Sequence, residues 1–98
     1  MTNKDDVLEM LDMGCKPTHR ETGNSMLPHI KSKQLVRLEP ATADSVEVGD
    51  IVLCRVKGRR MLHMVKAKNK KRGVLIANAK GHENGWTHIV YGKVIEKL

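Results

Sequence analysis

Gly23-Asn24-Ser25-Met26-Leu27-Pro28 is the stretch of this sequence that most constrains the fold. Gly23 permits tight or left-handed backbone geometry, and Pro28 restricts the chain on the other side of the serine. The stretch therefore predicts a rigid turn that presents the Ser25 hydroxyl. A serine between glycine and proline is ordinarily only a turn residue, so these six residues do not by themselves identify a nucleophile.

A serine nucleophile needs a neighbouring base to take its proton and a donor for the developing oxyanion. His63 lies on a predicted strand, and imidazole exchanges protons near neutral pH, which is the property that a general base needs. Taken alone, this pattern favours a half-buried strand histidine that bonds to the backbone. Lys66 is the nearest competing base, but residues 63 and 66 face opposite sides of a regular strand unless a bulge intervenes.

Hydrophobic patterning predicts a short helix over residues 3–13, followed after Gly14 and Pro17 by a small, mainly β domain. We expect the helix to pack on this domain, or else to act as an arm that docks on a partner. The later apolar runs are short and β-branched, which favours a meander of antiparallel strands with a bulge or bend at Gly92. The predicted strands are 34–38, 50–56, 60–67, 74–78 and 87–96, with turns at 57–60 and 69–73.

The 98 residues suit one domain, and with one Trp, one Tyr and no Phe its core must be aliphatic. The net charge of +7 permits an acidic or anionic partner without requiring one. Cys15 and Cys54 form no CxxC pair and are expected to be free thiols. With no apolar run long enough for a membrane span and an acidic start, we expect a soluble, cytoplasmic protein.

Further segments follow the serine turn in a characteristic order. They are the strand that ends at Pro40, Val48-Gly49-Asp50-Ile51-Val52-Leu53, a hairpin, the strand with His63, Ala79-Lys80-Gly81-His82-Glu83-Asn84 and Val90-Tyr91-Gly92-Lys93-Val94. This succession resembles the catalytic domain of the LexA/signal-peptidase superfamily of serine peptidases. The resemblance covers about residues 22–96, and we expect a helix and linker over 1–20 and a signal-peptidase-like β domain over 21–98.

The resemblance implies Ser25 as the nucleophile and His63 as the base, as in the histidine branch of the signal peptidases; LexA-like members use lysine. The substrate would be an extended peptide. An acidic residue orients the histidine in that branch, but His82 stands at its position here, with Glu83 one residue on. The remaining groups with an expected orienting or oxyanion role are Asn24 and Met26, and the Ser25 N–H is expected to contribute to the oxyanion hole.

A basic loop is the other feature with a functional interpretation. It contains Lys66, Lys68, Lys70, Lys71 and Arg72. It is either a solvated hairpin tip or a contact for nucleic acid or an acidic protein. The second interpretation gives the alternative function, an inactive member of the fold that acts as a binding or regulatory module of phage or bacterial type. We expect no metal and no cofactor, and the sequence leaves the oligomeric state open.

Overall fold

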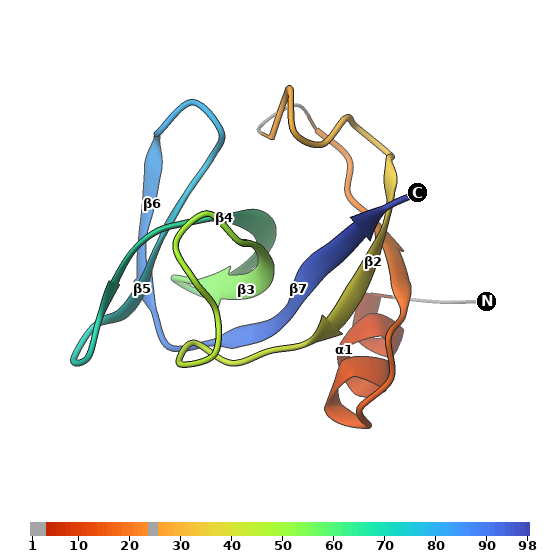
Figure 1. Ribbon diagram of the computed structural model, residues 1–98, viewed down its shortest axis with the longest axis horizontal. Coiled ribbons are helices and arrows are strands. Elements are labelled where there is room, and N and C mark those ends of the chain that lie inside the picture. Colours follow the sequence, from red (N-terminus) through yellow and green to blue (C-terminus); the bar gives the residue numbers. More distant parts are fainter. Residues whose placement is uncertain (1–3, 24–25) are drawn as a thin grey trace.

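A computed structural model describes residues 4–23 and 26–98. One helix precedes a single seven-stranded sheet whose strand order is β1-β2-β7-β3-β4-β5-β6, with every neighbouring pair antiparallel (Figure 1). The mainly β class predicted from the sequence is therefore confirmed. The elements are α1 (Lys4–Asp12), β1 (Thr18–Arg20), β2 (Leu35–Pro40), β3 (Ile51–Val56), β4 (Arg59–Asn69), β5 (Gly73–Ala77), β6 (Glu83–Thr87) and β7 (Val90–Lys97).

The sheet differs from a simple meander in the position of its last strand. The pair β1 and β2 and the run from β3 to β6 each follow the order of the sequence, while β7 returns to lie between β2 and β3. The strands β1 and β6 were not predicted, because β1 has three residues and β6 contains Asn84 and Gly85, which have low strand propensity. Backbone pairing with the neighbouring strands β2 and β5, rather than local propensity, makes both segments extended.

The strands β3 to β6 curl around an apolar cluster that we call the far core. The curl is closed by Thr87 on β6, whose Oγ1 donates a 2.6 Å hydrogen bond to the carbonyl oxygen of Arg55 on β3. Since β3 and β6 are not neighbours in the sheet order, this bond joins the two sides of the curl. The far core consists of Val46, Val52, Cys54, Val56, Val65, Val74 and Ile76.

A second cluster, which we call the site core, lies between α1 and the sheet. The helix contributes Val7 and Leu11, so it packs on the domain, as Figure 1 shows for α1 beside β2. Gly92 on β7 permits this approach, because a Cβ there would lie 2.8 Å from the carbonyl oxygen of Glu39 and 3.0 Å from Leu11 methyl groups. The site core consists of Val7, Leu11, Met26, Ile30, Val36, Leu38, Leu53 and Leu62.

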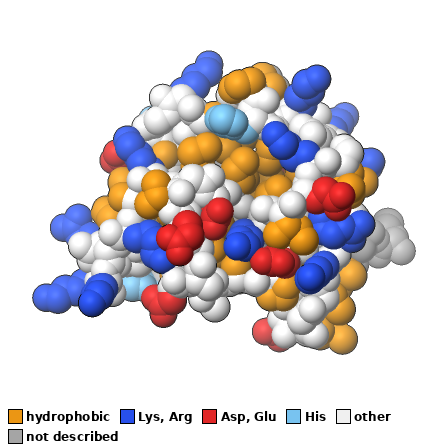
Figure 2. Space-filling model, in the orientation of Figure 1, with side chains coloured by type: hydrophobic (Ala, Val, Ile, Leu, Met, Phe, Trp, Pro, Cys, Tyr) orange, Lys and Arg blue, Asp and Glu red, His pale blue; other side chains and the backbone are white. Residues whose placement is uncertain are grey.

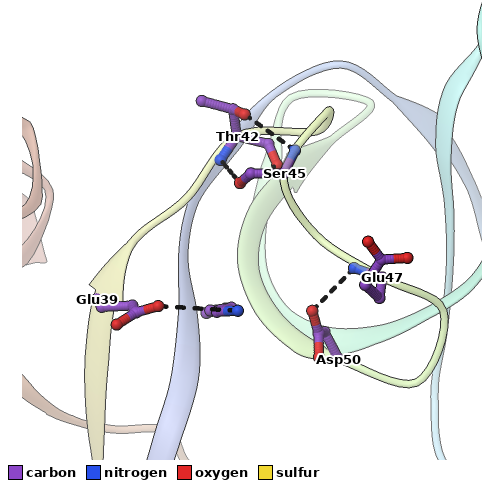
Figure 3. A network of polar contacts seen from close by, with 6 residues as sticks. Glu39, Thr42, Ser45, Glu47 and Asp50 are labelled. Carbon is purple, nitrogen blue, oxygen red and sulfur yellow. Dashed lines mark hydrogen bonds and ion pairs between the residues drawn. The ribbon is translucent and has the colours of Figure 1, made fainter.

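Reciprocal side-chain contacts hold the connection between β2 and β3 (Figure 3). The backbone N–H of Thr42 donates to Ser45 Oγ at 2.9 Å, and the N–H of Ser45 donates to Thr42 Oγ1 at 3.2 Å. Asp50 Oδ2 then accepts from the N–H of Glu47 at 2.9 Å. Asp50 thus has the structural role expected for the turn that leads into β3.

The β3–β4 hairpin positions the strand that contains His63, the candidate base. Its two-residue turn is formed by Lys57 and Gly58, with φ of 52° and 80°, which is the left-handed pair that a tight hairpin favours. The predicted turn is confirmed in position, although Arg59 and Arg60 already belong to β4. Across the hairpin, Val52 pairs with His63, so the register of β4 is set by the strand that crosses both cores.

Candidate active site

The structure describes the two flanks of the serine turn, up to Gly23 and from Met26 onward. Gly23 has a φ of 129°, as expected from the sequence, and its N–H donates to Ser32 Oγ at 3.0 Å. Met26 is 4% exposed within the site core, and its carbonyl oxygen accepts from the N–H of Ile30 at 2.9 Å. The predicted site residues Asn24 and Ser25 lie outside the described residues. The flanks of the turn are therefore anchored, one to a hydroxyl and the other in the apolar core.

One cavity joins this turn to the candidate base. Its volume is about 240 Å³, and Gly23, Met26, His63 and Asn84 all contribute to its lining. Residues from the serine turn, β4 and β6 thus meet, although they lie far apart in the sequence. Figure 2 shows this molecule's surface with hydrophobic side chains gathered at the centre of one face and basic side chains around them.

His63 is half-buried and is held by a side-chain hydrogen bond, with 2.8 Å between its Nδ1 and Asn84 Oδ1. An amide oxygen only accepts, so Nδ1 is the donor and carries the proton of the neutral ring. The basic lone pair of the ring then resides on Nε2. This is the tautomer that a serine nucleophile requires, and the bond also restrains the orientation of the imidazole.

Asn84 is a functional candidate that the sequence patterns did not reveal. Ile76 pairs with Gly85 and Ala77 pairs with Glu83, so Asn84 is the extra residue of a β-bulge between β5 and β6. Bulges redirect side chains and are frequent beside active sites. The only sequence signal was its position at the end of the Lys80–Asn84 loop, directly after the two residues expected to orient the histidine.

Those two residues, His82 and Glu83, make contacts of their own. His82 is exposed, and its backbone N–H donates to Asn78 Oδ1 at 2.9 Å. Glu83 forms an exposed ion pair, with 2.7 Å between its Oε2 and Lys66 Nζ. Lys66 is itself the extra residue of a bulge, since Val65 and Ala67 pair with consecutive residues of β5. The competing base, Lys66, therefore lies at a bulge, which is the condition under which residues 63 and 66 need not face opposite sides of the strand.

The basic loop uses much of its charge internally. Besides Lys66, Lys68 donates through Nζ to the carbonyl oxygens of Asp44 at 3.0 Å and Val46 at 2.6 Å. The Arg72 guanidinium lies 5.7 Å from the centroid of the Trp86 ring, within cation–π range. Lys70 and Lys71 are exposed. These contacts indicate a hairpin tip that is fixed to the rest of the fold, with part of its positive charge used in intramolecular contacts.

The cysteines are not part of the cavity. Cys54 is buried in the far core, and burial raises the pKa of its thiol from 9.0 to about 12. Cys15 is exposed, and both thiols are free. Within the described ranges, no three His, Cys, Asp or Glu side chains gather in the way metal ligands do, and no helix is long and apolar enough to cross a membrane.

Comparison with known proteins identifies the family of the chain. A family model described as Peptidase S24-like matches residues 16–93, which include the serine turn, His63 and Asn84. The chain belongs to the Peptidase S24-like family. This confirms the predicted LexA/signal-peptidase superfamily and its fold. A search of curated proteins found no match. Among the described helices and strands, α1 is the one that lies wholly outside the residues matched by the family model.

Proposed function

We propose that this chain is a serine peptidase of the signal-peptidase-like type, in which Ser25, His63 and Asn84 act together on an extended peptide. The observation that carries the proposal is the 2.8 Å contact between His63 Nδ1 and Asn84 Oδ1 in the cavity shared with Gly23 and Met26. Family membership supports the reaction class.

The reaction would proceed in two stages. His63 Nε2 takes the Ser25 hydroxyl proton while the oxygen attacks the peptide carbonyl carbon, and the same imidazolium then protonates the leaving amine. Water, deprotonated in turn by Nε2, hydrolyses the resulting ester. In both stages Asn84 keeps the proton on Nδ1 and the lone pair on Nε2. The Ser25 N–H is the proposed oxyanion donor, and Met26 anchors the turn through its buried side chain.

An amide differs from the carboxylate of the usual triad in one respect. It orients the ring but supplies no negative charge to stabilise the imidazolium that forms in the transition state. The proposed enzyme is therefore expected to be slower than a carboxylate-containing relative of the same geometry. Asn84→Asp, which introduces that charge in the same contact, should keep or raise the activity, whereas Asn84→Ala should remove the orientation.

The test combines active-site labelling with a fluorophosphonate and mass-spectrometric detection of cleavage in a mixed peptide library. Ser25→Ala should abolish both signals, and His63→Ala and Asn84→Ala should each lower the cleavage rate by about 10²–10⁴. The matched control is His88→Ala, because that exposed histidine bonds to the Lys71 carbonyl oxygen on another part of the chain. Wild-type protein that is labelled no more than Ser25→Ala contradicts the proposal and leaves the binding-module alternative.

A further inference from the structure

A second and larger cavity adjoins the one that contains His63. Its volume is about 830 Å³, and it extends over β1 and the Val7 and Met10 side of α1. Glu21, Thr22 and Arg60 line both cavities, so the two share a wall and form one groove. The groove begins at the proposed catalytic histidine, His63, and continues past Arg60 to β1.

Basic side chains dominate the charged lining of this groove. The first cavity has Lys31, Arg59 and Arg60, and the second adds Arg20. Against these four positive charges, Glu21 is the one carboxylate among the described lining residues, and its Oε1 lies 2.8 Å from His19 Nε2. The groove therefore presents a net positive potential to whatever occupies it.

The ion pairs of the described chain lie mostly elsewhere. Carboxylates pair with Arg37, Lys66 and Lys93 on the sheet. In the part of the chain that the structure describes, none pairs in this way with Arg20, Lys31 or Arg59. These three cations retain their capacity to bind an anionic group that the protein itself does not supply.

The rest of the lining favours a peptide over a nucleic acid. Apolar side chains such as Met26, Ile30, Leu62 and Leu35 lie among the basic ones. Among the described residues that line the two cavities there is no Trp or Tyr, whose rings provide stacking platforms for bases. A strand-like peptide presents alternate side chains to opposite sides, so apolar and acidic residues can each find a matching wall.

We propose that this groove selects extended peptides that carry Asp or Glu next to the bond to be cleaved, with Arg60 as the principal specificity residue. Arg60 is half-buried and stands where the two cavities meet, and a guanidinium can bind a carboxylate through two parallel hydrogen bonds. The inference names the substrate class of the proposed peptidase and so rests on that proposed function.

The test measures binding to the Ser25→Ala protein, which cannot turn the ligand over. Two fluorescent pools of degenerate octapeptides are compared by anisotropy at low salt, one with Asp or Glu at alternate positions and the other with Asn or Gln there. The acidic pool should bind about tenfold more tightly, and added Arg60→Gln should reduce this preference to below about threefold. Arg59→Gln provides a second variant if Arg60→Gln lowers the melting temperature.

The matched control is Lys70→Gln, which removes the same charge from the exposed β4–β5 turn. It should leave the preference intact. Equal binding of the two pools, or an equal effect of Lys70→Gln and Arg60→Gln, overturns the inference. A thymidine dodecamer that binds more tightly than the acidic pool, with the same dependence on Arg60, also overturns it in favour of a nucleic acid.

Wild-type hydrolysis of the same two pools separates this inference from the proposed function. Selective binding of the acidic pool without any cleavage would sustain the groove's specificity and contradict the peptidase. Cleavage of both pools at equal rates with equal affinities would sustain the peptidase and contradict the charge selection.

Discussion

The site core and the far core are built on one sheet but are closed in different ways. The far core is surrounded by consecutive strands that curl until Thr87 bonds to Arg55, and all its members except Val46 of the β2–β3 connection lie on those strands. The site core needs two additions from outside the sheet, the helix α1 and the turn that contains Met26. The region with the candidate chemistry is therefore the one assembled from the most distant parts of the sequence.

This difference separates stability from function within a small domain. Met26 and Leu62 of the site core are the direct sequence neighbours of Ser25 and His63, whereas the far core contains neither of these flanking positions. A change in the site core should alter both packing and the candidate site. A change in the far core should alter the free energy of unfolding while the active geometry of the folded molecules persists.

The largest expected effect on stability is at Gly73, which begins the strand β5 beside the far core. A Cβ at this position would lie 2.2 Å from the carbonyl oxygen of Thr87, and the φ of +90° already disfavours other residues. Gly73→Ala should lower the free energy of unfolding by on the order of 4 kcal/mol, from overpacking and backbone strain together. Urea denaturation measures this loss.

Gly58→Ala is the control for backbone strain alone. Gly58 also has a positive φ, of +80°, but a Cβ added there would meet no atom within 4 Å beyond its immediate chain neighbours. The substitution should cost only about 1 kcal/mol. Equal losses for the two variants would show that the close approach to Thr87 is not what constrains Gly73.

A pair of core truncations tests the comparison directly. Leu62→Ala in the site core should cost about 2–5 kcal/mol and Val74→Ala in the far core about 2 kcal/mol, because each removes buried methyl groups. At a temperature where both are folded, only Leu62→Ala should lower kcat/KM, since Leu62 lines the cavity with His63. Peptide cleavage normalised to folded protein provides the measurement, and an equal loss in Val74→Ala would show that the two regions are not separable.

The burial of Cys54 in the far core predicts a pH effect on stability. Burial raises the pKa of its thiol to about 12 from 9.0, so the folded state holds the proton more tightly than the unfolded state does. This contribution to stability is present below pH 9 and is lost as the pH rises toward 12. Between pH 9 and pH 10 the loss is about 1 kcal/mol.

Urea denaturation of wild type and Cys54→Ala at these two pH values isolates the thiol, because the other titrating groups are common to both proteins. Wild type should lose about 1 kcal/mol more than the variant. Equal losses would mean that the far core admits water to the thiolate. Exposed Cys15 should react with iodoacetamide at pH 8 while Cys54 does not.

The smallest effect is expected at Lys66. Its ion pair with Glu83 is exposed on both sides, so Lys66→Ala should change the free energy of unfolding by about 1 kcal/mol or less. Activity should stay at the wild-type level, because the proposed base is His63. A loss of activity comparable with that of His63→Ala, at unchanged stability, would identify the lysine as the base instead.

Much of this protein was predictable from local signals. The positive φ of Gly23, the 57–60 hairpin and the helix near residues 3–13 follow from backbone preferences and hydrophobic period, which act over a few residues. The ordered set of motifs correctly predicted the superfamily and the mainly β fold. The candidate roles of Ser25 and His63 came from the same motifs and stay predictions for the activity tests.

Three features required the folded chain. The return of β7 between β2 and β3 depends on pairing across more than 30 residues, which no local pattern records. The contact of Asn84 with His63 depends on a bulge, and a bulge is defined by the register of two strands rather than by either one. The basic groove likewise combines Arg20, Lys31 and Arg60 from separate segments. The sequence by itself determined the family, the local turns and the residue types at the candidate positions, because residue type and short-range geometry are local. Only the tertiary structure decided which of them meet, because strand register and curl arise from contacts between distant segments.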